Sequence, residues 1–133
     1  PDNESKISNR VKYGGFLDRI EVKNVMKESV YLSLDINPAC PNTVIEAMSC
    51  GTPVVAFDTG ALPELVKNGT GLIVSYGSNP WDLEYPDVNR LQKAILQIFS
   101  NYQIFSKNAK NRANACFTMK KIISKYLEFL GLN

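Results

Sequence analysis

The stretch PNTVIEAMSCG at residues 41–51 combines a predicted helix start with a single acidic side chain. At a helix N-terminus the first backbone N–H groups have no partner within the helix, and the helix dipole adds partial positive charge. Asn42, Thr43 and Val44 would offer these amides to an anion, for which a diphosphate fits and a free carboxylate is not excluded. Glu46 follows within the first turns, where its carboxylate would face a pair of sugar hydroxyls, because carboxylates chelate vicinal diols.

The same residues also have a purely structural interpretation. Thr43 and Glu46 form the Thr-x-x-Glu pattern of a capping box, in which two side chains satisfy backbone N–H groups at a helix start. This pattern is a common helix signature. The spacing alone therefore leaves open whether Glu46 binds a ligand or only closes the helix start.

Composition restricts the chemistry that this chain can do. Its 133 residues include no histidine, so the commonest general base and metal ligand is absent, and acid–base work falls to carboxylates, lysines or the substrate. Cys40, Cys50 and Cys116 show no zinc-binding spacing and cannot pair evenly, which favours a reducing compartment. We interpret Cys50 as a small buried residue rather than a nucleophile, because no histidine is available to activate it.

Charge is unevenly distributed along the chain. Residues 1–87 carry a net charge of −5 and residues 88–133 a net charge of +7, which together give the overall +2. We interpret the basic part as a solvated helix face, with contact to an anionic membrane surface as the second interpretation. Nucleic-acid binding is not expected, because no base-reading motif accompanies the lysines. No apolar run is long enough for a transmembrane helix, and the sequence has no signal-peptide pattern.

Apolar segments with strand and helix patterns alternate along the chain, which predicts an α/β fold with a parallel sheet and right-handed crossovers. In such sheets ligands bind beyond the carboxyl ends of the strands, where loops 35–42 and 58–63 are expected. The predicted strands are residues 10–13, 30–34, 53–57 and 71–74, and the predicted helices are residues 21–29, 43–50, 62–66, 87–99 and about 119–130.

Two groups of aromatic and apolar side chains need an explanation. Trp81 and Tyr85 lie in the long loop 75–89, and we expect them to cover the edge of the core, with stacking on a sugar or base as the alternative. The last helix carries apolar residues along one side, for which core packing is expected and membrane-surface docking is the alternative. These are Ile122, Ile123, Tyr126, Leu127 and Leu130.

Several spaced motifs occur in a fixed order. EAMSCGTPVV at 46–55 is followed by GALPE at 60–64 and by NGTGLIV at 68–74. VKYGGF at 11–16 and YLSLDINP at 31–38 precede them, and FTMKKIISKYLEFL at 117–130 closes the chain. This order resembles the C-terminal donor-binding domain of retaining GT-B glycosyltransferases of glycosyltransferase family 4, also called glycosyl transferases group 1. The resemblance covers nearly the whole chain.

The resemblance implies a role for each matching position in the central motif. Glu46 would bind the ribose hydroxyls of a nucleotide, and the backbone amides of Asn42 and Thr43 would hold its diphosphate. Asp58 to Gly60 would shape the pocket floor near the sugar, whereas Glu64 would order its own turn. Upstream, the resemblance implies that Gly14, Gly15 and Phe16 sit near the base.

Two departures from the family pattern concern the chemical step. Pro38 stands where the family has its first acid, and a proline cannot ionise. That acid's role is absent here, is taken by a neighbour such as Asp35, or is supplied elsewhere, so no catalytic residue is assigned. The family's donor-binding arginine and lysine lie further upstream than this chain begins, and Arg10 and Lys12 do not match them.

The resemblance therefore implies a Rossmann-like parallel sheet flanked by helices, the C-terminal half of a GT-B fold incomplete at its N-terminus, over residues 1–133. The intact enzyme would move a sugar from a UDP-, GDP- or ADP-linked donor to a hydroxyl of a glycan or lipid-linked acceptor. Its partner would be an N-terminal acceptor domain, without which this chain would be inactive. We expect no metal or other cofactor, and a cytoplasmic location at or near the inner face of the membrane. The alternatives are a non-catalytic nucleotide-binding or scaffold module and a nucleotide-sugar epimerase.

Overall fold

The fold is built around a small parallel sheet, which a computed structural model describes within residues 11–132. Strands β1 (Tyr31–Ser33), β2 (Val54–Phe57) and β3 (Gly71–Val74) pair side by side in the order β1-β2-β3. Their registers align Tyr31 with Val54 and Val54 with Gly71. The predicted Rossmann-like α/β architecture is confirmed, and three of the four predicted strands are present.

Helices cover both faces of this sheet, which is why β2 reads as a continuous apolar run. Val54 and Ala56 face one core, shared with α2 (Asn42–Ser49), α3 (Leu62–Leu65) and α5 (Tyr102–Cys116). Val55 and Phe57 face a second core, shared with α4 (Val88–Ser100). Side chains alternate across a strand, so β2 joins the two cores as a fully buried central strand.

Helix α1 (Arg19–Met26) lies at the amino-terminal end of the sheet. The Thr52 hydroxyl, two residues before β2, donates a hydrogen bond to the Met26 carbonyl and ties the helix end to that edge. Asp18 begins the helix with a capping box in which its carboxylate accepts from the Ile20 and Glu21 amides.

The structure corrects the predicted strand at residues 10–13. Arg10 lies outside the described residues, and Val11 to Tyr13 form no strand. They are exposed, with 94% of the Tyr13 side chain accessible. A strand needs a neighbour to bond to, and no described strand runs beside these residues.

Helix α5 was not predicted, although it is the longest described helix. It buries only Ala109 and Ala113, so its sequence lacks the row of large apolar residues that indicates an amphipathic helix. The small side chains let α5 pack closely against α2, and α5 thereby becomes part of the first core.

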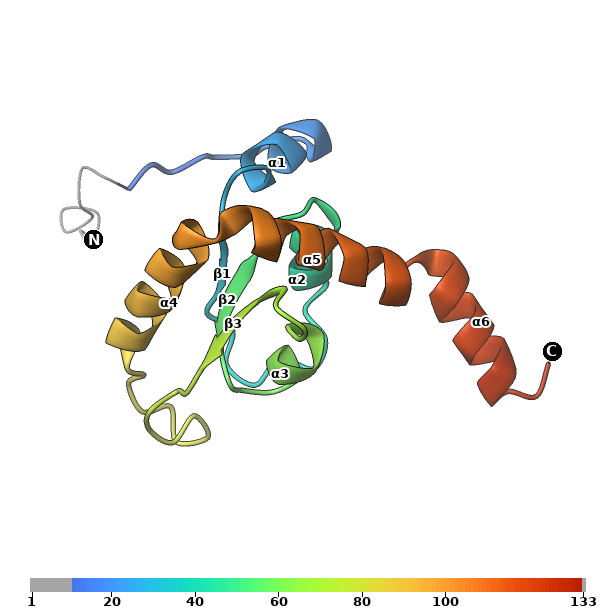
Figure 1. Ribbon diagram of the computed structural model, residues 1–133. Helices are drawn as coiled ribbons and strands as arrows, with labels where there is room; N and C mark the ends of the chain where they lie inside the picture. The colour runs from blue at the N-terminus through green and yellow to red at the C-terminus, as the bar shows by residue number, and fades with distance from the viewer. Residues whose placement is uncertain (1–10, 133) are drawn as a thin grey trace.

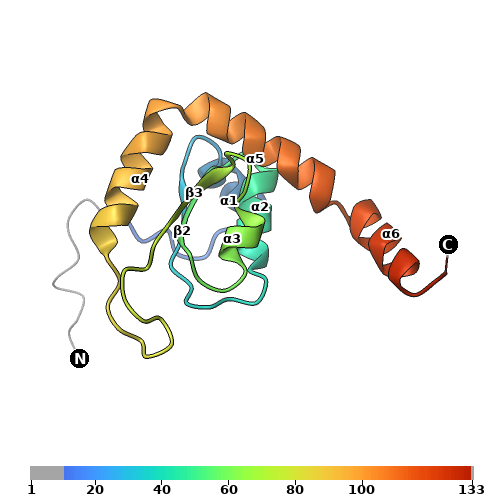
Figure 2. The same ribbon diagram turned by 60° about the horizontal axis from the view of Figure 1, so that its bottom comes forward.

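Helix α6 (Met119–Phe129) confirms the predicted last helix but not its packing. It has no buried residue, and Figures 1 and 2 both show it projecting away from the sheet and its covering helices. Trp81 and Tyr85 are 78% and 96% exposed. The interpretation of these aromatic residues and of the α6 side chains as core cover is therefore wrong for this structure: α6 contacts α5, but of its apolar side chains only Ile122 is half-buried and the others are exposed.

Candidate functional site

The candidate site lies at the carboxyl-terminal edge of the sheet. The strands are parallel, so the loops after β1, β2 and β3 all leave from this edge. The loop after β1 leads into α2, and the loop after β2 leads into α3. In Figure 1 both loops lie below the sheet beside α3, and backbone hydrogen bonds join them. This is the edge at which α/β proteins bind ligands.

The N-terminus of α2 offers two backbone donors at this edge. Its N-cap is Pro41, whose carbonyl accepts from the Val44 amide at 3.1 Å. Within residues 11–132 the Asn42 and Thr43 amides donate to no acceptor, and both residues are exposed. The predicted anion site therefore has two available amides rather than three, because the Val44 amide is engaged and its side chain is buried.

The capping box predicted between Thr43 and Glu46 is wrong. The helix begins at Asn42, one residue before the predicted start, and its N-cap makes no side-chain hydrogen bond. Thr43 thus lies inside the first turn, and the N-cap residue, Pro41, has no backbone N–H that the Glu46 carboxylate could accept from. Its carboxylate is exposed and makes no hydrogen bond or ion pair within the described residues.

Asn42 and Glu46 are four residues apart, which places them on one face of α2 about one turn apart. The free amides at the helix start and the free carboxylate are thus accessible from the same side. An anion at the amides and a pair of hydroxyls at the carboxylate could be held together. The structural alternative for Glu46, that it serves only as a helix cap, does not hold.

Gly60 sets the approach of the second loop to the first. Its φ of +53° lies in the left-handed region, and a Cβ at this position would collide with the backbone of Asn37 and Pro38. The neighbouring Ala61 amide donates to the Pro38 carbonyl at 2.8 Å. The Thr59 hydroxyl donates to the Asp35 carbonyl at 3.4 Å. The two loops therefore form one connected floor, which only glycine at position 60 allows.

No described residue takes the place of the family's first acid by its geometry. Pro38 uses its carbonyl to hold Ala61. Asp35 is exposed at the start of the same loop, and its carboxylate makes no hydrogen bond or ion pair within the described residues. The Asp35 carboxylate is available for chemistry, but nothing in the structure fixes its direction.

Asp58, which the resemblance assigns to the pocket floor, forms a depression with the loop after β3, whose part in it the sequence did not predict. The Asp58 carboxylate accepts from the Tyr76 amide at 2.7 Å and joins the ends of β2 and β3. Arg90 pairs with Asp87 at 2.9 Å, and this hydrogen bond lowers the pKa of Asp87. The sequence does contain a signal for this depression, because Asp58 and Ser75 each follow directly after a predicted strand. It measures about 580 Å³ and is lined by Asp58, Ser75, Tyr76, Gly77, Ser78, Pro80 and Arg90.

Gly14, Gly15 and Phe16 lie apart from this edge. They precede α1, which sits at the amino-terminal end of the sheet, as the upper part of Figure 1 shows. The Phe16 side chain is fully exposed, and a Cβ added to Gly15 would meet no atom within 4 Å. The structure therefore brings Asn42, Thr43, Glu46 and Gly60 together but not these three residues.

Comparison with known proteins adds a family to this geometry. The family model described as Glycosyl transferases group 1 matches residues 2–101. The chain belongs to this family. It is thus a glycosyltransferase domain of the GT-B type, and the match includes both loops of the candidate site together with α2.

Named relatives are similar to this glycosyltransferase domain over different parts of its length. One subunit of the phosphatidylinositol N-acetylglucosaminyltransferase of Homo sapiens is 26% identical over 121 residues, which is 90% of this chain and 24% of that protein. Lipopolysaccharide core biosynthesis mannosyltransferase LpsB of Rhizobium meliloti is 40% identical over 85 residues, which is 54% of this chain and 24% of that protein.

A shorter match joins the glycosyltransferase domain to the D-inositol 3-phosphate glycosyltransferase of Streptomyces bingchenggensis. It is 41% identical over 54 residues, which is 41% of this chain and 12% of that protein. The chain therefore spans about a quarter or less of each of these three relatives.

Proposed function

We propose that residues 1–133 are the donor-binding domain of a retaining glycosyltransferase that moves a sugar from a nucleoside-diphosphate sugar to an acceptor hydroxyl. The observation that carries this proposal is the face of α2 at the carboxyl edge of the sheet. It combines two unengaged amides, at Asn42 and Thr43, with the exposed and unpaired carboxylate of Glu46. Family membership and the relatives named for sugar transfer support glycan biosynthesis as the setting.

In this proposal each group has one task. The Asn42 and Thr43 amides and the α2 dipole bind the diphosphate, since a helix N-terminus stabilises negative charge. Glu46 accepts hydrogen bonds from the two ribose hydroxyls. The turn around Gly60 forms the floor beneath the transferred sugar. The placement of the base beside Gly14, Gly15 and Phe16 stays a prediction, because these residues precede α1, which lies at the amino-terminal end of the sheet.

The chemical step is assigned to the donor's own phosphate rather than to a protein base. The chain has no histidine, and Pro38 occupies the position of the family's first acid. A leaving phosphate that accepts the proton of the incoming hydroxyl needs no side-chain base and fits transfer with retention. No metal is part of the proposal, because the helix N-terminus itself can offset diphosphate charge.

The proposal includes an acceptor domain of the same enzyme, without which these residues do not transfer sugar. Two exposed apolar surfaces support a further packed domain. One is the face of α6, where Met119, Tyr126 and Phe129 are 70%, 65% and 88% exposed. The other is an apolar groove of about 330 Å³ beside β1, the edge strand of the described sheet. It is lined by Leu32, Leu34, Val88, Leu91, Gln92, Ile95 and Leu96.

The proposal places the enzyme in the cytoplasm or at the inner face of the membrane. None of the helices that the structure describes has the length and apolar character to cross a bilayer. Lys120 and Lys125 border the apolar face of α6, so a second candidate for that face is an anionic membrane surface. Sedimentation of the chain with anionic but not neutral vesicles would favour this candidate over a protein domain.

A non-catalytic nucleotide-binding module is the alternative function, and Pro38 is the observation that favours it. Both functions require nucleotide binding at α2, so they differ only in the transfer step of the intact enzyme. Restoring an acid with Pro38→Glu in the intact enzyme separates them. A gain of sugar transfer from an undetectable parent rate would indicate a module that has lost its acid, whereas a measurable parent rate that Pro38→Glu leaves unchanged or reduces would indicate an enzyme adapted to proline.

The donor site is tested by titrating the chain with UDP, GDP, ADP and CMP by calorimetry. The proposal predicts saturable binding that favours one nucleoside diphosphate. Replacing Glu46 by alanine removes hydrogen bonds to a charged acceptor, worth about 1.5–3 kcal/mol, and weakens Kd roughly 10- to 150-fold. Glu128→Ala on α6 makes the same charge change on an exposed helix away from the site and should leave Kd unchanged. Equal losses in the two variants would refute a ribose contact.

A further inference from the structure

Arg112 on α5 makes two short hydrogen bonds to the end of another helix. Its Nε donates to the Leu65 carbonyl and its Nη2 donates to the Glu64 carbonyl, both at 2.8 Å. These carbonyls stand at the carboxyl-terminal end of α3. A planar guanidinium can bind two neighbouring oxygens at once, which an ammonium group cannot match in geometry.

The end of α3 needs such a partner. A helix leaves its last carbonyls without intrahelical donors, and they carry partial negative charge. The chain turns away at Val66, whose φ of −92° and ψ of 83° are not helical. Arg112 therefore satisfies two carbonyls that the four-residue helix cannot satisfy itself.

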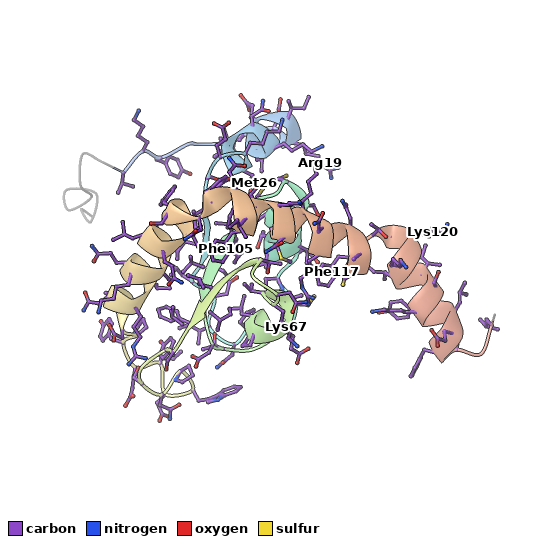
Figure 3. The ribbon with its side chains drawn as sticks, viewed as in Figure 1. Arg19, Met26, Lys67, Phe105, Phe117 and Lys120 are labelled. Atoms are coloured by element: carbon purple, nitrogen blue, oxygen red, sulfur yellow. The ribbon has the colours of Figure 1, made fainter. Side chains whose placement is uncertain are left out.

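The guanidinium of Arg112 is itself held in place. Its Cζ lies 5.5 Å from the centroid of the Phe117 ring, a cation–π distance. Ala109 and Ala113, on either side of Arg112 in α5, are buried in the first core together with Leu65. Figure 3 labels Phe117 at the carboxyl-terminal end of α5, above the segment with Lys67 that follows α3. The contact is thus built on a helix that packs into the first core.

The opposite end of α3 is part of the candidate donor site. The Glu64 and Leu65 amides donate to the Ala61 carbonyl at 3.0 and 3.1 Å, and the Ala61 amide donates to the Pro38 carbonyl. Gly60 packs against the backbone of that same loop. A continuous series of contacts therefore leads from Arg112 through α3 to the loop that ends at the N-terminus of α2.

From these contacts we infer that Arg112 is a positioning residue for the donor site. It fixes the end of α3, α3 fixes the Gly60–Ala61 turn, and this turn fixes the loop before Asn42. This inference rests on the proposed function for its effect on nucleotide affinity, whereas its effect on the loop is independent of any ligand. Arg112 itself touches no substrate.

Asn108 provides a matched comparison on the same helix. It lies one turn before Arg112, and its Nδ2 donates to the Gly69 carbonyl at 3.4 Å. It therefore also links α5 to a loop carbonyl. That loop joins the end of α3 to β3, so Asn108 bonds to a carbonyl beyond α3, whereas Arg112 bonds to carbonyls of α3 itself. A general loosening of α5 contacts should affect both variants, whereas positioning of the donor site should require only Arg112.

The test uses Arg112→Met, Arg112→Lys and Asn108→Ala in this chain. Amide hydrogen exchange reports the Ala61 bond to Pro38 without any ligand, and calorimetry reports the Kd of the best-bound nucleoside diphosphate. We expect Arg112→Met to speed Ala61 exchange and to weaken nucleotide binding, with Kd raised about 3- to 10-fold. For Arg112→Lys, both the exchange rate and Kd should lie between those of Arg112→Met and the parent chain. Asn108→Ala should change neither the Ala61 exchange rate nor Kd. Arg112→Lys serves in place of Arg112→Met should the latter not fold.

The outcomes separate this inference from the proposed function. Ala61 exchange that is unchanged in a folded Arg112 variant overturns the positioning role, whatever the affinity. An equal change in Asn108→Ala also overturns it. A parent chain that binds no nucleoside diphosphate refutes the donor site instead, while faster Ala61 exchange in the Arg112 variants alone would still support the link from α5 to the loop.

Discussion

Gly60→Ala should damage the candidate site through the backbone and not through lost contacts. Residue 60 has a φ of +53°, and its missing Cβ would overlap backbone atoms of Asn37 and Pro38. Backbone atoms cannot rotate away as the end of a side chain can. The left-handed conformation costs alanine roughly 1–2 kcal/mol and the overlap adds about 1–3 kcal/mol, so we expect a loss of about 2–5 kcal/mol in the free energy of unfolding.

Gly69→Ala is the matched control for this prediction. Residue 69 has a similar φ of +71°, but the atom nearest to an added Cβ is the flexible Asn108 Nδ2 at 3.1 Å. Gly69→Ala should therefore lose only the conformational cost of roughly 1–2 kcal/mol. Urea unfolding of both variants measures the difference. Equal losses in the two variants would refute the close approach of the two loops and with it the shared floor of the site.

Two further predictions concern residues away from the floor. Trp81→Ala should change the free energy of unfolding by less than about 0.5 kcal/mol, because its side chain is 78% exposed; a larger loss on urea unfolding would place it against the core. Burial raises the pKa of Tyr102, whose hydroxyl donates to the Ser29 carbonyl at 3.2 Å. The folded state thus prefers the protonated hydroxyl, so this stability is complete below the unfolded pKa of about 10 and declines as pH rises through the higher folded pKa. Tyr102→Phe should reduce that alkaline decline, and an unchanged pH profile would contradict it.

The central part of the fold could be predicted because its signals are local. A few neighbouring residues are enough to predict each element. Examples are the β-branched run at Val54 and Val55, the turn residues on both sides of it, and the periodic apolar residues of α4. The presence of Glu46 at the start of a helix followed from the same stretch. The first residue of the helix was misplaced by one position and its cap by two, because Thr-x-x-Glu imitates a cap wherever it occurs and Pro41 is the N-cap here.

The parts of the fold and of the site that the sequence did not predict depend on contacts between residues far apart in the chain. Helix α5 has only small residues on its buried side, so its packing against α2 leaves little pattern in the sequence. The pairing of Arg112 with the carbonyls of Glu64 and Leu65 joins residues almost fifty positions apart. The exposed apolar face of α6 shows the converse case, in which a clear amphipathic pattern predicts a helix without identifying what covers it.

The most direct test of the donor site follows individual backbone amides by NMR while the preferred nucleoside diphosphate is added. We predict that the amide resonances of Asn42 and Thr43 shift most and saturate together, since these two donors would bind the diphosphate. The amide of Gly131, beyond α6, should not move. Saturable binding that leaves Asn42 and Thr43 unmoved, or no binding to any of the four nucleotides, would contradict a donor site at the start of α2.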